Sequence, residues 1–129
     1  MSGELEGRKI LLVDDDADIL TAMRAALKDT DAEVITAGDG DTAVRKIAAD
    51  KPDLVVLDMM LPKRSGFLVI EHLRDQGGEA PHIIMITGNQ GTRHRVYAES
   101  LGVDMYINKP FRMERLLDGI RNILGEVAS

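Results

Sequence analysis

Residues 53–58 read Asp-Leu-Val-Val-Leu-Asp, and the rest of the chain is arranged around this stretch. The four apolar residues 54–57 follow Pro52 closely and are rich in β-formers. A run this short and this apolar predicts a strand that is buried on both faces. The run ends on a carboxylate, Asp58, which a buried strand does not itself require. Because the carboxyl ends of strands line the ligand crevice of an open parallel sheet, we expect Asp58 to act as a nucleophile.

Length and composition restrict the class of protein. The 129 residues are enough for one domain with one good core. The net charge of −6 argues against direct nucleic-acid binding, because phosphate contacts need clustered lysine and arginine. The absence of cysteine excludes disulfides and thiolate chemistry. The sequence contains no signal-peptide pattern and no apolar run near the roughly 20 residues that span a bilayer. We therefore expect a cytoplasmic protein without membrane contact.

Strand and helix patterns alternate five times along the chain. The expected strands are residues 10–13, 33–37, 54–57, 83–86 and 105–108. Segments with helical character follow each of them, and the connections are short. This order predicts an α/β fold with a parallel sheet, helices on both faces and right-handed crossovers. Asp16, Asp39 and Ser65 are expected to cap the first three helices.

The fourth helix, expected over residues 92–101, has the poorest apolar stripe. Val96 and Leu101 are its candidates for facing inward, among charged neighbours. A thin stripe predicts a helix that is loosely held. The histidines are scattered without a second ligand type at metal spacing, so we interpret them as surface or packing residues. The basic pair Lys63-Arg64 is interpreted as a solvated face, as is the segment 93–95.

Four of the expected strands end in polar residues of complementary chemistry. These residues are Asp14 and Asp15, Asp58, Thr87 and Lys109. In a parallel sheet they all lie at one edge, where three carboxylates repel one another unless a cation lies among them. Oxygen ligands with open positions suit Mg²⁺. Lys109 adds a charge for a phosphate and Thr87 a hydroxyl donor, so the set resembles the parts needed for phosphoryl transfer to a carboxylate.

Simpler interpretations exist for each of these residues. The acids at 14–16 could form a helix-capping cluster, Thr87 could be an ordinary strand residue and Lys109 a solvated lysine. A calcium loop beginning at residue 14 does not fit, because Ile19 and Ala25 occupy the positions that need glycine and glutamate. The agreement among four strand ends favours a functional site over these separate explanations.

At this point the chain resembles the receiver domain of two-component response regulators, and it is similar in size to the single-domain chemotaxis regulator. The motifs are Val13-Asp14-Asp15, Leu57-Asp58-Met59-Met60-Leu61-Pro62, Ile86-Thr87-Gly88 and Asn108-Lys109-Pro110-Phe111. The resemblance divides the chain into an N-terminal extension, a receiver domain and a C-terminal tail, at residues 1–7, 8–126 and 127–129. One departure is Ser65, where the family often has aspartate; as a helix cap it leaves the chemistry intact.

The resemblance implies a flavodoxin-like (βα)5 fold with strand order 2-1-3-4-5. It implies a Mg²⁺ site at Asp14 and Asp15, completed by Asp58 and the backbone carbonyl of Met60. Asp58 would accept a phosphoryl group from a histidine kinase or a histidine phosphotransfer protein. The resemblance also implies a cis peptide bond between Lys109 and Pro110.

We expect a signalling module and not an enzyme, one that catalyses only its own phosphotransfer and slow autodephosphorylation. Tyr106 matches the family's aromatic switch position. We expect Thr87 to be drawn toward the phosphoryl group and Tyr106 to turn inward, which changes the face made by the fourth helix, fifth strand and fifth helix. The partner that binds this face would be a downstream protein or an output domain that this sequence does not include.

Two other functions use similar parts. A haloacid-dehalogenase-like phosphatase has its nucleophile on the first strand and its acidic pair last, whereas here the acidic pair comes first and Asp58 is central. Such an enzyme also carries a cap domain, which this chain lacks room for. A flavodoxin-like cofactor binder should have a loop rich in Ser, Thr and Gly after its first strand. Residues 14–16 are instead all aspartate.

Overall fold

A five-stranded parallel sheet forms the centre of the protein, and the computed structural model describes residues 3–78, 80–88 and 92–128. The strands are β1 Lys9–Val13, β2 Glu33–Ala37, β3 Leu54–Asp58, β4 His82–Thr87 and β5 Met105–Asn108. The helices between and after them are α1 Ala17–Leu27, α2 Gly40–Asp50, α3 Gly66–Gln76, α4 Thr92–Ser100 and α5 Met113–Ala128, and a 3-10 turn, Lys28–Thr30, follows α1. None of the described helices has the length and apolar character that crossing a bilayer requires.

The strand order is β2-β1-β3-β4-β5, which confirms the expected topology. β3 lies at the centre and pairs with β1 on one side and β4 on the other, so Val56 lies between Leu12 and Ile84. Every residue of β3 is buried, as its apolar run predicted. This central position brings Asp58, the last residue of β3, to the carboxyl edge of the sheet.

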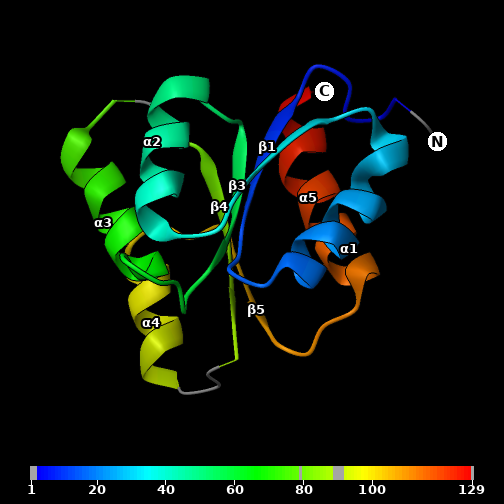
Figure 1. Ribbon diagram of the computed structural model, residues 1–129. Helices are drawn as coiled ribbons and strands as arrows, with labels where there is room; N and C mark the ends of the chain where they lie inside the picture. Colours follow the sequence, from blue (N-terminus) through cyan, green and yellow to red (C-terminus); the bar gives the residue numbers. More distant parts are fainter. Residues whose placement is uncertain (1–2, 79, 89–91, 129) are drawn as a thin grey trace.

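Two apolar layers cover the two faces of the sheet. Figure 1 shows α2, α3 and α4 on one face and α1 and α5 on the other. Alternation along β3 divides its side chains between the layers: Val55 and Leu57 pack toward α2 and α3, while Leu54 and Val56 pack toward α1 and α5. Burial on both faces is the reason that the sequences of β1, β3 and β4 are continuously apolar and not alternating.

Side chains of the preceding loops cap three helices, as the sequence predicted. The carboxylate of Asp16 accepts hydrogen bonds from the backbone at the start of α1, and Asp39 accepts one from Thr42 at 2.7 Å. The Ser65 hydroxyl accepts the backbone N–H of Leu68 at 3.3 Å. These bonds satisfy backbone donors that would otherwise have no partner within the helix.

The segment before β1 packs against the last helix and the turn after α1. Leu5 is buried in the layer of α1 and α5, and its backbone N–H donates to the carbonyl of Thr30 at 2.8 Å. Glu4 forms an ion pair with Arg121 of α5 at 3.0 Å. Leu5 therefore contributes to the core.

α4 contacts the neighbouring helix α3 through aromatic and polar side chains. Phe67 stacks on His94, with ring centroids 6.0 Å apart, and meets Tyr97 edge-on at 5.1 Å. The Tyr97 hydroxyl donates to the carboxylate of Glu71, and the Arg74 guanidinium donates to the carbonyl of Leu101 at 2.7 Å. We call this set of contacts the α3–α4 seam.

The expectation that Val96 faces inward is wrong, because its side chain is 58% exposed. Ala98 is the buried residue of α4, whose residues are all described, and Leu101 packs against the core just beyond the helix. Val96 and Leu101 are five positions apart, which on a helix turns their directions apart by about 140°. One side of the helix could not bury both, and the stripe that reaches the core contains Ala98.

Candidate functional site

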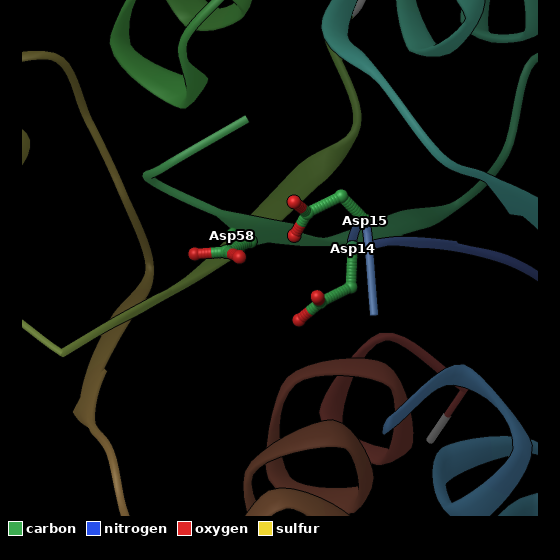
Figure 2. A group of neighbouring side chains, drawn as sticks. All are labelled: Asp14, Asp15 and Asp58. Carbon is green, nitrogen blue, oxygen red and sulfur yellow. The ribbon is translucent and has the colours of Figure 1, made fainter. Parts of the chain in front are cut away.

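Three carboxylates meet at the carboxyl edge of the sheet. Asp14 and Asp15 follow β1, and Asp58 ends β3, the strand beside it. One oxygen from each carboxylate lies within 4.8 Å of the others. Figure 2 shows the three side chains directed toward a common space. The parallel sheet thus brings together acids that lie far apart in the sequence.

Asp58 is 4% exposed, and both of its carboxylate oxygens have partners. Oδ1 accepts the backbone N–H of Met60 at 3.1 Å, and Oδ2 lies 3.4 Å from Nζ of Lys109. Burial raises the pKa of Asp58, and the charge of Asp14 raises it further, against the lowering effects of the Met60 N–H and Lys109. A carboxylate that is partly removed from water in this way gains stability when a cation binds beside it.

Lys109 places its ammonium group between two of the acids. Nζ lies 3.4 Å from Oδ2 of Asp14 and 3.4 Å from Oδ2 of Asp58. Burial alone lowers the pKa of Lys109, but the two carboxylates outweigh it, and the net pKa is raised. The side chain therefore stays charged at neutral pH. The Lys109–Pro110 peptide bond is cis, as the family resemblance implied.

The two acids after β1 differ in exposure. Asp14 is buried, and its Oδ1 accepts the backbone N–H of Asp16 at 2.9 Å. Asp15 is exposed at the mouth of the site. Among the described residues, the ammonium of Lys109 is the positive group within bonding distance of these carboxylates, so negative charge is in excess. An all-oxygen donor set with this excess fits a hard divalent cation such as Mg²⁺.

Thr87 and Tyr106 lie on the two strands beyond β3. Thr87 ends β4, is fully buried and accepts the backbone N–H of Lys109 at its carbonyl, at 2.8 Å. Tyr106 on β5 is 7% exposed, and the guanidinium of Arg95 lies 5.7 Å from its ring centroid. Burial raises the pKa of Tyr106, while Arg95 acts in the opposite direction. Because the ring is already buried, an inward turn from an exposed position is not available to this conformation.

The arrangement of acids and lysine on a 2-1-3-4-5 sheet agrees with a comparison of the sequence with known families. Residues 10–121 match the response regulator receiver domain. The chain belongs to this family. Receiver domains are the phosphorylated signalling modules of two-component systems, and the chain is such a module.

Relatives and solved structures agree with this assignment. The chain is 40% identical over 117 residues to the alkaline phosphatase synthesis transcriptional regulatory protein PhoP of Bacillus subtilis (strain 168), a match that covers 91% of this chain and 48% of that protein. The chain thus spans about half the length of this curated relative. The receiver domain protein (CheY-like) from Methanospirillum hungatei JF-1 has a TM-score of 0.82 at 31% identity, covering 92% of this chain and 94% of that one. The BeF3-activated receiver domain of Klebsiella pneumoniae RstA has a TM-score of 0.80 at 33% identity, covering 89% and 97%.

Sequence reasoning missed two ion pairs of this receiver domain. Lys63 and Arg64, interpreted as a solvated pair, lie against acids of α2 and its cap. Arg64 Nε is 3.0 Å from Oδ1 of Asp41, and Lys63 Nζ is 3.9 Å from Oδ2 of Asp39. Arg64 and Asp41 are 23 positions apart, so no local pattern indicates the contact. The one indication in the sequence was that the residues at 63–64 are basic and those at 39 and 41 are acidic.

Gly66, at the start of α3, lets the loop after β3 pass close to the site. A Cβ atom there would lie 2.6 Å from the carbonyl oxygen of Asp58 and 2.9 Å from Cα of Met59. We predict that Gly66→Ala lowers the free energy of unfolding by about 1–3 kcal/mol, because backbone must shift to make room. Equilibrium urea unfolding measures this change.

Gly125→Ala is the matched control for Gly66→Ala. Gly125 lies within α5 and has no neighbour within 4 Å of an added Cβ. Alanine has the higher helix propensity, so this control should be neutral or up to about 1 kcal/mol more stable. Equal effects of the two substitutions would contradict the steric explanation.

Proposed function

We propose that Asp58 accepts a phosphoryl group from a histidine kinase or a histidine phosphotransfer protein, in a reaction that requires Mg²⁺. The observation that supports this most is the position of the buried Asp58 carboxylate, which shares a space with two further carboxylates and the ammonium of Lys109. Nucleophile, cation site and fixed positive charge are the parts that phosphoryl transfer to a carboxylate needs.

Each side chain has a distinct role in this proposal. An oxygen of Asp58 attacks phosphorus, a new O–P bond forms, and the P–N bond of the phosphohistidine donor breaks. Asp14, Asp15, Asp58 and the backbone carbonyl of Met60 would hold Mg²⁺, which when bound offsets the negative charge of the carboxylates and the phosphoryl oxygens. Lys109 keeps its proton throughout and supplies a second positive charge beside Asp58.

A direct test uses the intact protein and a small phosphoryl donor. Incubation with acetyl phosphate and Mg²⁺ should add the mass of one phosphoryl group per chain, and EDTA should prevent the addition. Continuous turnover of a generic phosphomonoester would instead favour a phosphatase of the haloacid-dehalogenase type. No gain of mass from acetyl phosphate or from a phosphorylated kinase would overturn the proposal.

Thr87 is proposed to carry the signal from the phosphoryl group to the face made by α4, β5 and α5. Its position at the end of β4, next to the Asp58 strand, supports this role, as does the placement of Tyr106 on the following strand. The Thr87 hydroxyl donates to a phosphoryl oxygen, and the repacking around Tyr106 that accompanies this movement shifts the population of α4 positions. Because Tyr106 is already buried, the change is one of packing and not of exposure.

We predict that Thr87→Ala still accepts a phosphoryl group at Asp58 but loses most of the response of α4 and β5. The site keeps its nucleophile, while a coupling of about 1–3 kcal/mol between site and face is removed. Amide chemical shifts of the ¹⁵N-labelled protein, recorded before and after phosphorylation, measure the response. Thr87→Ser retains the hydroxyl and should behave like the parent. If phosphorylation of Thr87→Ala changes the amide chemical shifts of α4 and β5 as much as in the parent, Thr87 does not carry the signal.

The output of this receiver domain is a further part of the proposal. PhoP of Bacillus subtilis is named a transcriptional regulatory protein, and this chain corresponds to about half of its length. We propose that the signal passes to a downstream protein or to an output domain outside this sequence, without direct nucleic-acid binding by residues 8–126, the proposed receiver domain. Family membership also supports a cytoplasmic location, no membrane contact and no turnover of other substrates.

A further inference from the structure

The loop between β3 and α3, residues 59–65, lies directly against the start of α2. The backbone N–H of Gly40 donates to the carbonyl of Pro62 at 3.3 Å. A Cβ atom on Gly40 would lie 2.0 Å from the carbonyl oxygen of Arg64, so the two backbones touch. The absence of a side chain at Gly40 is what permits this approach.

Two ion pairs flank that backbone contact, and they differ in quality. The Arg64–Asp41 pair has a hydrogen-bonded geometry with Nε 3.0 Å from Oδ1, and its side chains are 33% and 42% exposed. The Lys63–Asp39 pair is longer, at 3.9 Å, and the carboxylate of Asp39 is already bonded to the backbone of Thr42. The Arg64–Asp41 pair is therefore the stronger of the two connections.

At its other end, the same loop contacts Asp58, the proposed phosphoacceptor. The backbone N–H of Met60 donates to Oδ1 of Asp58 at 3.1 Å. Two further bonds brace the loop: the N–H of Gly66 donates to the carbonyl of Met59 at 2.9 Å, and that of Arg64 to the carbonyl of Pro62 at 2.7 Å. A displacement of the loop at Arg64 is transmitted through this short, internally bonded segment to the amide that orients Asp58.

We propose that the Arg64–Asp41 ion pair is a latch that positions the Met60 backbone, and through it the Asp58 carboxylate, for cation binding and phosphoryl acceptance. Arg64 and Asp41 are positioning residues in this account, since neither touches the reacting atoms. The direction of the effect rests on the proposed function of Asp58. Opening the latch leaves the fold intact but lets the Met60 amide move away from Oδ1, so the carboxylate samples more orientations.

The size of the effect follows from the exposure of the pair. Partly exposed ion pairs contribute little to global stability and are weakened by salt. We therefore expect Arg64→Ala to bind Mg²⁺ about two- to fivefold more weakly than the parent, with a nearly unchanged unfolding midpoint. The difference from the parent should shrink at high ionic strength, because salt opens the latch in the parent as well.

The test is a titration of the full chain with magnesium chloride, followed by calorimetry and by amide chemical shifts. Arg64→Ala should weaken Mg²⁺ binding and should shift the amide of Met60 before any cation is added. The double variant Arg64→Asp with Asp41→Arg should restore both values, whereas Arg64→Asp alone should not. Arg121→Ala is the matched control, because Arg121 of α5 also pairs with an acid at 3.0 Å, Glu4 in the segment before β1.

The outcomes separate the latch from the proposed function. If Arg64→Ala binds Mg²⁺ as tightly as the parent, the latch is overturned. The same holds if the double variant binds Mg²⁺ no more tightly than Arg64→Asp alone. A loss in Arg121→Ala equal to that in Arg64→Ala would also overturn it, because the effect would then not depend on where in the protein the ion pair lies. A parent that binds Mg²⁺ but never gains a phosphoryl group overturns the role of Asp58 as acceptor, while the titration of Arg64→Ala still decides the latch.

Discussion

Asp58→Ala should gain phosphoryl groups from acetyl phosphate at least about a hundredfold more slowly than the parent. The variant lacks the one carboxylate that combines burial at the end of β3 with a backbone donor and an ammonium partner. Asp14 is the alternative acceptor that the variant tests, because it is also buried, with its Oδ1 bonded to the backbone of Asp16 and its Oδ2 facing Lys109. Intact-protein mass spectrometry over a time course measures the gain directly.

An exposed acid outside the site supplies the control for Asp58→Ala. Asp75→Ala removes an exposed carboxylate of α3 and should accept a phosphoryl group at the parental rate. The assignment of Asp58 is wrong if its alanine variant keeps the parental rate and stoichiometry. Peptide mapping of the phosphorylated parent should place the modification in the segment that contains Asp58.

Asp15→Ala should weaken Mg²⁺ binding at least about tenfold and should raise the stability of the cation-free protein by about 1 kcal/mol. The two changes have opposite signs because the same carboxylate attracts the cation and repels Asp14 and Asp58. Asp15 is exposed, so its removal leaves no buried group without a partner. Calorimetric titration measures the affinity, and urea unfolding in EDTA measures the stability.

Asp18→Ala is the matched control for Asp15→Ala. Asp18 is an exposed acid in the first turn of α1, three positions further on. Its removal lowers the net negative charge equally but should leave Mg²⁺ affinity nearly unchanged. It should slightly destabilise the protein, because an acid at a helix N-terminus is favourable. An unchanged Mg²⁺ affinity in Asp15→Ala would exclude Asp15 as a ligand.

The parts of this fold that the sequence predicted are those that local patterns determine. Apolar runs of about four residues identified the buried strands, and the alternation of strands with helices indicated parallel pairing. The strand ends then predicted that Asp14, Asp58 and Lys109 lie at one edge of the sheet. The three helix caps were predictable for the same reason, since each depends on residues only a few positions away.

The parts that the sequence did not predict depend on how separate elements approach each other. The Arg64–Asp41 pair exists because the loop after β3 passes the start of α2 at backbone contact. The burial of Tyr106 depends on the layer of α2, α3 and α4 that closes over β5. The prediction that Val96 faces inward was wrong, because two apolar residues among charged ones do not define which side of the helix meets the core.

The α3–α4 seam implies that α4 has a local stability of its own, lower than that of the sheet. Ala98 is the buried side chain among the described residues of this helix, and its other contacts include aromatic and polar contacts with α3 and the approach of Arg95 to the Tyr106 ring. Such a helix opens by breaking partly solvated contacts, so its amides exchange with solvent deuterium well before those of β3. A coupling of about 1–3 kcal/mol between the site and α4, as proposed above, would thus act on a weakly held helix. We therefore expect one phosphoryl group to change the position of this helix while the five strands beneath it remain paired.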